Sequence, residues 1–413
     1  MKVDLLIKNA NQLITPVHAA AGFGELKVLE NGAIGCYQGK ITVIGTSKDL
    51  LNRVELTTGA AVIDASQKVI APGFVDPHTH PVFWGTRENE FVMRIEGKSY
   101  REISEAGGGI RSSVRNLRKA SVEQLIETAI PHLDNFLKTG TTTIEAKSGY
   151  GLTLEDEIKS LKVIKELNRL YDIDLVPTFL GAHEIPDEYR TKRNDYIKLI
   201  IEEMMPRVAE EGLAEFCDIF CEDHVFNVEE TRKILTAAKQ AGFKLKIHAD
   251  QLTASGGSEL AAELDAISAD HLDYITPPAM EQLKKHGVIP VILPGAVFFL
   301  GLERYAPARE MIDFGLPVAL ATDFNPGSCM TESMPILITI ACINMRILPH
   351  EAWVAATINA ARAINRSNSI GSLDIGKDAD IVVWNMPNAD YLPYHFGINL
   401  VDKVIKRGKV VVE

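Results

Sequence analysis

Short apolar runs alternate with helical patterns through the middle of the chain, from about residue 68 to residue 365. Eight of these runs have the length and composition of buried strands. They span residues 69–76, 141–146, 175–180, 214–220, 243–248, 266–270, 288–293 and 317–322. Strands that are apolar throughout and separated by helices indicate a parallel sheet covered on both faces. Eight such units predict an α/β fold of the (β/α)8 TIM-barrel type. The alternative is a doubly wound open sheet, but no G-x-G-x-x-G motif follows a strand.

Two of the intervening segments carry clear helix signals. The Ser121 hydroxyl can cap a helix, with Gln124 three residues later reaching back to it. Apolar residues then recur at helical spacing until Gly140, which is a natural stop. The same spacing predicts a second helix over residues 154–170.

The two ends of the chain resemble each other and differ from the middle. Residues 1–64 have the composition of short strands and turns, as do residues 381–384 and 403–413. No long helix is predicted after about residue 365. We therefore expect a small β-sandwich-like domain formed by residues 1–64 and 366–413, and a barrel domain over residues 65–365.

Composition narrows the class of protein. Among 413 residues, 46% are hydrophobic and 24% are charged, which is typical of a soluble globular chain. No apolar run is long enough to span a membrane, and the polar start lacks a signal-peptide core, so we expect a cytoplasmic location. The net charge of −12 disfavours nucleic acid and anionic membranes as partners. Five cysteines do not suggest a disulfide framework, and we interpret Cys217 and Cys221 as buried free thiols rather than metal ligands.

Polar residues follow most of the predicted strands, where the active site of a TIM barrel lies. The residues at these strand ends include Asp76, His78, His80, Lys147, Tyr150, His183, Glu184, Glu222, His224, His248, Asp250, Gln251, Asp270, His271, Asp323 and Asn325. Histidines scattered over a surface would not collect at strand ends. The arrangement therefore supports the barrel and predicts a site at its mouth.

The pair His78-x-His80 is the sharpest local signal. Side chains two apart on a strand point to the same face, so both imidazoles can bind one cation. His248 and Asp323 are the best remaining ligands, and a set of three nitrogens and one oxygen suits zinc, with iron or manganese as alternatives. Such an ion lowers the pKa of a bound water toward neutrality. The alternative role for Asp323 is to cap a following helix.

These residues carry a resemblance to the amidohydrolase superfamily over nearly the whole chain. The supporting segments are APGFVDPHTH (71–80), the later His248, His271 and Asp323, and GSLDIGKDADIVVW (371–384). Within that superfamily the chain closely resembles the imidazolonepropionases. The segments that carry this closer resemblance are HTHPVFWGTRENEF (78–91), GGGIRSSVR (107–115), EAKSGYGL (145–152), GAHE (181–184), HADQL (248–252), SADHLDY (268–274) and TDFNPGS (322–328).

The resemblance implies hydrolysis of the small molecule 4-imidazolone-5-propanoate to N-formimidoyl-L-glutamate, by opening of a cyclic amide with a metal-bound hydroxide. It implies one divalent ion per subunit, zinc or iron, and a homodimer. A single ion also agrees with the fourth predicted strand, whose end (218–224) lacks the lysine that bridges two metals in related hydrolases. The implied metal ligands are His78, His80, His248 and Asp323. The implied substrate contacts are Arg87, Tyr100, Tyr150, His183, Gln251, Asn325, Gly327 and Ser328, and His271 is implied as a catalytic histidine.

The residue chemistry agrees with that substrate and raises one question. The planar guanidinium of Arg87 suits a propanoate carboxylate. Some members of the family carry Glu where this chain has Gln251, and an amide cannot accept a proton from water. We therefore expect Asp323, His271 or both to act as the base. Trp84 is expected to narrow the pocket.

Two other functional classes remain open at this point. One is a related cyclic-amide hydrolase or aromatic deaminase on the same barrel, which Arg87 and Tyr150 disfavour because uncharged rings need no carboxylate anchor. The other is a non-catalytic scaffold, which the intact set of His78, His80, His248 and Asp323 disfavours.

Overall fold

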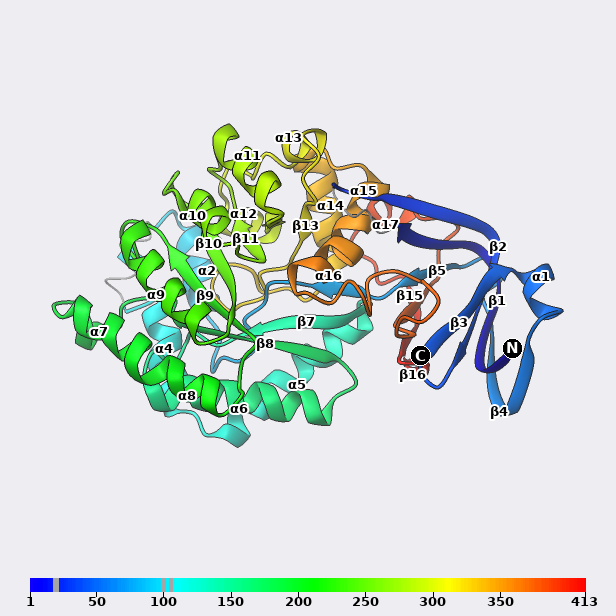
Figure 1. Cartoon of the computed structure of the whole chain (residues 1–413), viewed down its shortest axis with the longest axis horizontal. Coiled ribbons are helices and arrows are strands. Elements are labelled where there is room, and N and C mark those ends of the chain that lie inside the picture. The colour runs from blue at the N-terminus through cyan, green and yellow to red at the C-terminus, as the bar shows by residue number, and fades with distance from the viewer. Residues whose placement is uncertain (18–21, 99–101, 104–106) are drawn as a thin grey trace.

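A computed structural model describes residues 1–17, 22–98, 102–103 and 107–413, and it contains two eight-stranded sheets (Figure 1). One sheet runs in chain order with every neighbouring pair parallel. Its strands are β6 (Phe74–Asp76), β7 (Thr141–Lys147), β8 (Asp174–Ala182), β9 (Phe216–Cys221), β10 (Lys244–Ala249), β11 (Ser268–His271), β12 (Ile289–Ile292) and β13 (Ala319–Leu320). The prediction of a (β/α)8 barrel is confirmed, and each predicted strand of the middle region overlaps one of these.

Backbone hydrogen bonds join the first strand of the barrel to the last. The His80 amide donates to the carbonyl of Phe324 at 2.8 Å, and the Asp323 amide donates to the carbonyl of His78 at 3.1 Å. The seam therefore closes at the residues for which a metal-binding role was predicted.

Helices surround this sheet and occupy the connections between its strands (Figure 1). They are α2 (Glu88–Ile95), α4 (Ile110–Lys119), α5 (Val122–Lys138), α6 (Leu154–Leu170), α7 (Arg193–Leu199), α8 (Met205–Glu210), α9 (Val228–Gln240), α10 (Gly257–Glu263), α11 (Pro277–His286), α12 (Pro294–Leu300), α13 (Ala308–Asp313), α14 (Met334–Met345), α15 (Pro349–Val354) and α16 (Ala360–Ala363). Short turns of 3₁₀ or π geometry are η1 (Asp187–Tyr189), η2 (Ile200–Met204) and η3 (Ala355–Asn359). Ser121 and Gln124 form the predicted capping box of α5, and α6 covers the second predicted helix.

The second sheet joins the two ends of the chain, as Figure 1 shows in blue and red. Its strands are β1 (Lys2–Val17), β2 (Glu25–Tyr37), β3 (Lys40–Thr46), β4 (Glu55–Asp64), β5 (Val69–Pro72), β14 (Ile381–Trp384), β15 (Val401–Lys406) and β16 (Lys409–Val412). The short helices α1 (Ser47–Leu51) and α17 (Tyr391–Tyr394) accompany them. The division of the chain at residues 64/65 and 365/366 stays a prediction.

One predicted strand is wrong in detail. The run 69–76 is two strands, because the chain passes from the terminal sheet to the barrel at Gly73. The Gly73 amide donates to the carbonyl of Asp380 at 3.0 Å, and a Cβ at this position would lie 2.4 Å from the Thr142 hydroxyl oxygen. An uninterrupted apolar run does not reveal such a change of sheet, since both halves are buried.

Aromatic and ionic contacts fix the terminal sheet against the barrel. The rings of Phe74 and Trp353 lie 5.1 Å apart, and Trp384 lies 5.3 Å from Phe74. Beside them, the buried Lys406 ammonium lies 2.6 Å from Asp380 and 2.8 Å from Asp174. A buried cation needs such partners, because removing one leaves an uncompensated charge.

Two predictions based on composition concern the cysteines and membrane-spanning helices. Cys217 and Cys221 are buried free thiols, as predicted, and burial raises the pKa of Cys221 to about 11. Within the described parts of the chain, no helix combines the length and the apolar character needed to cross a membrane.

Candidate active site

A cavity of about 710 Å³ opens at the carboxyl ends of the barrel strands. It collects most of the predicted site residues, namely His80, Arg87, Tyr150, His183, His248, Gln251, His271, Asp323, Asn325, Gly327 and Ser328. His78 is buried just beside these residues, and Tyr100 lies outside the described residues. Trp84 packs against the core and is not among the described residues that line the cavity.

His78 and His80 on the chain after β6 face Asp323 across the seam. The Nε2 atoms of His78 and His80 lie 3.6 Å and 3.7 Å from Asp323 Oδ1. His78 Nδ1 contacts Asp270 Oδ2 at 2.6 Å, and because a carboxylate accepts, this nitrogen carries the proton. The unprotonated Nε2 of His78 is therefore left for a cation, in the arrangement typical of metal-binding histidines.

His248 and His271 complete the cluster from β10 and β11. Their rings lie 5.2 Å apart, and the His248 ring lies 4.4 Å from that of His78. His248 Nδ1 is 3.0 Å from Asp218 Oδ2, a distance typical of an ion pair, although the two groups lack the alignment of a hydrogen bond. Asp218 thus contacts the Nδ1 atom of His248, just as Asp270 contacts the Nδ1 atom of His78.

The donor set fits a divalent cation. The buried atoms His78 Nε2, His80 Nδ1 and His271 Nδ1 have no hydrogen-bond partner. Burial lowers the pKa of each of these histidines, so they are neutral and their lone pairs are available. Overlapping groups of ligand atoms lie within 4.8 Å of one another; they are His78–His80–Asp323, His78–His248–His271, His80–His183–His248 and His78–Glu145–Asp270.

Asp323 faces the histidines of this cluster and does not cap a helix. Its backbone is left-handed, with φ 57°, and Ser328 Oγ donates to its Oδ2 at 3.1 Å. Burial raises the pKa of Asp323 to about 7. The alternative of a helix cap is wrong, because the next helix, α14, begins only at Met334 with Ser333 before it.

The loop after β7 brings Tyr150 to the cavity beside His183. The rings of the two residues lie 5.4 Å apart. His183 Nδ1 contacts the carbonyl oxygen of Gly149 at 2.9 Å, so this nitrogen must donate. Burial lowers the pKa of His183 to about 3, which keeps its Nε2 unprotonated. The buried Glu157 accepts backbone N–H groups from Gly149, Gly151 and Leu152 and so fixes this loop.

Arg87 also lines the cavity, and it packs directly on Gly327. Its Nη2 donates to Glu90 at 2.6 Å, while its buried Nε has no partner. A Cβ at Gly327 would meet Arg87 Nη1, so a side chain at this position would displace the guanidinium. Arg94, which was not predicted from the sequence, lines the same wall and donates to the Gly327 carbonyl at 3.1 Å.

Asn325 and Ser328 form the turn that supports Asp323. The Asn325 side chain accepts from the amides of Gly327 and Ser328 and donates to the Asp323 carbonyl. Both ends of its amide group are therefore engaged within the turn. Gln251 is half-buried at the edge of the cavity, directly after β10.

The strand interiors hold five buried charged groups that the sequence analysis gave no role. They are Glu145, Lys147, Asp218, Lys246 and Asp270, all without exposed surface. The available signal was a charged residue inside a strand that was predicted to be buried, as in TTTIEAK and KLKIHA. Burial alone would lower the pKa of Lys147, but Asp218, Glu145 and Asp270 raise it above its ordinary value.

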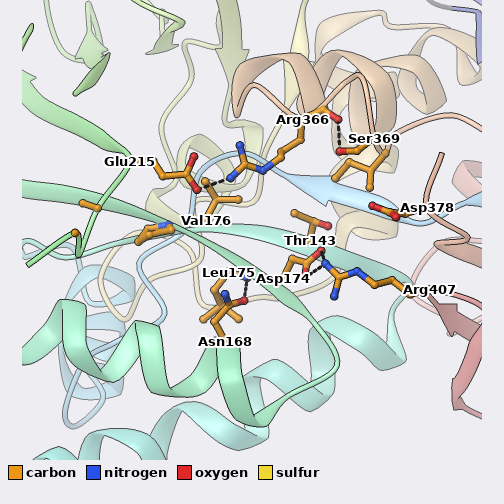
Figure 2. Close-up of a pocket in the computed structure, with 14 residues that line it drawn as sticks. Thr143, Asn168, Asp174, Leu175, Val176, Glu215, Arg366, Ser369, Asp378 and Arg407 are labelled. Carbon is orange, nitrogen blue, oxygen red and sulfur yellow. Dashed lines mark hydrogen bonds and ion pairs between the residues drawn. The ribbon is translucent and has the colours of Figure 1, made fainter. Parts of the chain in front are cut away.

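A second pocket, of about 430 Å³, lies at the amino ends of the barrel strands (Figure 2). Its arginines are engaged by carboxylates, Arg407 with Asp174 and Arg366 with Glu215. Catalytic groups of TIM barrels lie at the opposite end. This pocket therefore belongs to the junction of the barrel with the C-terminal segments rather than to the candidate active site.

Comparison with known proteins agrees with the fold and the site. Residues 69–411 match the amidohydrolase family, and the chain belongs to that family. Curated imidazolonepropionases from Alkaliphilus metalliredigens and Geobacillus thermodenitrificans are 47% and 48% identical to it, with 100% and 99% of this chain and 99% and 98% of theirs covered. The resemblance inferred from the sequence is confirmed.

A solved structure gives the same picture of the fold at much lower identity. An adenosine deaminase from Xanthomonas campestris with bound zinc superposes with a TM-score of 0.73 at 19% identity, covering 100% of this chain and 93% of that chain. The amidohydrolase family is metal-dependent, and the His and Asp groups of this chain fit such an ion.

Proposed function

We propose that this protein hydrolyses 4-imidazolone-5-propanoate to N-formimidoyl-L-glutamate, a step of histidine degradation. The observation that carries the proposal is that a cation-binding cluster and Arg87 open into one cavity. The cluster suits hydrolysis of an amide, and the guanidinium suits the carboxylate of the propanoate. The high similarity to imidazolonepropionases supports this substrate over other cyclic amides.

The reaction adds one water across a ring amide. The water oxygen bonds to the ring carbonyl carbon, the bond from that carbon to the ring nitrogen breaks, and the nitrogen takes up a proton. A divalent ion held by His78, His80, His248 and Asp323 would polarise the carbonyl and acidify the water. The chain's own groups must bind the substrate and move the protons.

Arg87, His183 and Tyr150 are suited to orient the substrate. Arg87 would bind the propanoate with the nitrogens that Glu90 does not occupy. His183 donates through Nδ1 to Gly149, so its Nε2 can only accept, which suits a ring N–H rather than the ring carbonyl. Burial raises the pKa of Tyr150, so its hydroxyl stays protonated and can donate.

Asp323 and His271 are the candidates for proton transfer. Asp323 presents Oδ1 to the histidines, while Ser328 donates to its other oxygen. His271 belongs to this cluster and also lines the cavity, and it would pass the proton to the leaving nitrogen. Gln251 would contribute hydrogen bonds only.

A second candidate is hydrolytic deamination of an aromatic ring, since the deaminase with the same fold has a metal centre on this barrel. Arg87 and Arg94 speak against it, because two cations in one wall suit an anionic substrate. Turnover of the imidazolone, hydantoin, dihydroorotate and guanine by the metal-replete protein tests both. Activity on guanine without activity on the imidazolone would overturn the proposal.

The proton path is tested by kcat/KM against pH. Gln251→Ala is expected to slow catalysis without changing the shape of the profile, because an amide does not titrate near neutral pH. His271→Ala is expected to lower kcat while metal is retained and to change the profile. Full turnover in His271→Ala together with none in Gln251→Ala would contradict this mechanism.

Three further properties are proposed on the resemblance and the donor set. The ion would be zinc or iron, because nitrogen ligands with one carboxylate suit both. The chain would form a homodimer and act in the cytoplasm. Elemental analysis of the purified protein, light scattering and localisation of a tagged chain test these properties one by one.

A further inference from the structure

The buried ion cluster, defined as Glu145, Lys147, Asp218, Lys246 and Asp270, lies beneath the candidate metal ligands. Its members come from four strands of the barrel sheet, β7, β9, β10 and β11, with β8 between the first two. Lys147 Nζ lies 2.6 Å from Asp218 and 3.0 Å from Glu145. Lys246 Nζ lies 2.7 Å from Glu145 and 3.5 Å from Asp270. Every charged group of the cluster therefore has an opposite charge beside it.

Each aspartate of the cluster connects a lysine to a candidate ligand. Asp270 Oδ2 lies 2.6 Å from His78 Nδ1, and Asp218 Oδ2 lies 3.0 Å from His248 Nδ1. The second oxygen of each aspartate is held as well, by the Ser268 hydroxyl for Asp270 and by the Ile219 amide for Asp218. In each aspartate, one oxygen therefore contacts an imidazole while the other accepts a hydrogen bond.

Lys246 also acts on the backbone of the first barrel strand. Its Nζ donates to the carbonyl of Pro77 at 2.7 Å, next to His78 in the chain. One amine thus fixes both the side-chain partner of His78 and the peptide that carries it.

We propose that Lys147 and Lys246 are positioning residues of the metal centre. They hold Asp218 and Asp270 so that His248 and His78 present their Nε2 atoms to the same divalent cation. Partners of this kind orient metal-binding histidines, and their loss typically lowers metal affinity about ten- to a hundredfold. The proposal rests on the metal site of the proposed function and is independent of the substrate.

Charge and orientation predict opposite effects of removing a lysine. The cluster has three carboxylates against two ammonium groups, an excess of one negative charge. Replacing a lysine by methionine makes the surroundings of the cation more negative, which by charge alone strengthens binding. Loss of orientation weakens binding. Weaker binding of the cation would therefore indicate the effect of orientation, and tighter binding would indicate the effect of charge.

The test measures the dissociation constant for Zn²⁺ by competition with a chelator, in the absence of substrate. Lys147→Met and Lys246→Met are expected to bind Zn²⁺ about ten- to a hundredfold more weakly than the parent. The visible absorption spectrum of the Co²⁺-loaded protein is expected to change shape in the same variants. Lys406→Met is the matched control, because Lys406 is equally buried between two carboxylates but lies at the junction with the terminal sheet.

If a single variant fails to fold, the double variant Glu145→Gln/Lys147→Met tests whether Lys147 orients Asp218. It keeps the excess of one negative charge and removes the amine that orients Asp218, while Lys246 keeps the Pro77 carbonyl and Asp270 as partners. Weaker binding of Zn²⁺ in this variant supports the proposal. Affinity within twofold of the parent, as expected for Lys406→Met, or tighter binding in the single variants would overturn it. A parent protein that binds no metal would instead refute the proposed function.

Discussion

Gly327 shapes the substrate side of the cavity by the absence of a side chain. Arg87 Nη1 occupies the space that a Cβ would need, at 2.1 Å. The guanidinium can approach the turn of residues 325–328 only because this position is glycine. Arg94, which donates to the Gly327 carbonyl, adds a second cation to the same wall.

Gly327→Ala is therefore expected to raise KM by displacing Arg87, with metal content unchanged. The natural control is Gly45→Ala, since Gly45 has no atom within 4 Å of an added Cβ. Steady-state kinetics and metal analysis of the two variants give the comparison. A KM equal to that of the parent would mean that Arg87 does not need this position.

Arg87→Met removes the proposed carboxylate anchor directly. Loss of a hydrogen bond to a charged group costs about 1.5–3 kcal/mol, which corresponds to a KM about ten- to a hundredfold higher. Arg169→Met is the control, because Arg169 is exposed on α6 and pairs only with Glu166 there. Equal KM values for all three proteins would place the propanoate elsewhere in the cavity.

Single elements of the barrel are fixed at their starts by side chains. Helix α9 connects β9 to β10, which carry Asp218 and His248. Asn227 and Glu230 form a capping box at its first turn, and Arg193 binds the Glu230 carboxylate. The capped start of α9 thus helps to define the spacing of two strands that meet at the site.

The Glu230 carboxylate predicts a pH-dependent contribution to stability. Burial tends to raise its pKa, but the hydrogen bonds from Arg193 and the Asn227 amide lower it overall, below the ordinary 4.5. A lowered folded-state pKa means that the stabilisation is present above pH 4.5 and is lost as the pH falls through the folded value. Glu230→Gln should cost about 1 kcal/mol at pH 7 and much less in acid.

Urea unfolding of the parent and of Glu230→Gln, at pH 7 and in acid, measures the difference in the free energy of unfolding. Glu229→Gln serves as the control, because the Glu229 side chain is 84% exposed in the same turn. A cost that is the same at both pH values would show that ionisation of Glu230 contributes nothing.

Elements were more predictable from sequence than the boundaries between sheets. Apolar runs and caps predicted the barrel strands and α5, because burial and capping leave local patterns. The change of sheet at Gly73 left none, since it depends on Asp380, which lies about 300 residues away in the chain. The strand-end histidines were found by position. Lys147 was placed at a strand end but given no role, and Lys246 was not considered, because their carboxylate partners are recognised only in three dimensions.

At the scale of the whole molecule, the proposed metal ligands lie on both sides of the seam that closes the barrel. His78 and His80 follow the first strand, and Asp323 follows the last. An ion bound there would connect segments that, among the described residues, two backbone hydrogen bonds join at this seam. Binding to the folded state alone stabilises it by mass action.

Removal of the metal is therefore expected to lower the melting temperature, and added Zn²⁺ should restore it. At an ion concentration a hundredfold above Kd, the stabilisation is about 2.7 kcal/mol. His248→Ala and His78→Ala should lose bound metal, activity and the Zn²⁺-dependent shift together. Stoichiometric metal in either variant would contradict the ligand assignment.

The seam also sets an order of events during synthesis. His78 and His80 leave the ribosome long before Asp323, and β5, directly before the first barrel strand, pairs with β14 near the end of the chain. A polypeptide that ends between residues 248 and 323 holds three imidazoles of the proposed set but lacks the carboxylate that completes it. With the proposed ligand set, acquisition of the ion would be a late event, because a truncated product lacks at least one ligand. Bound metal would then mark chains whose translation has passed residue 323.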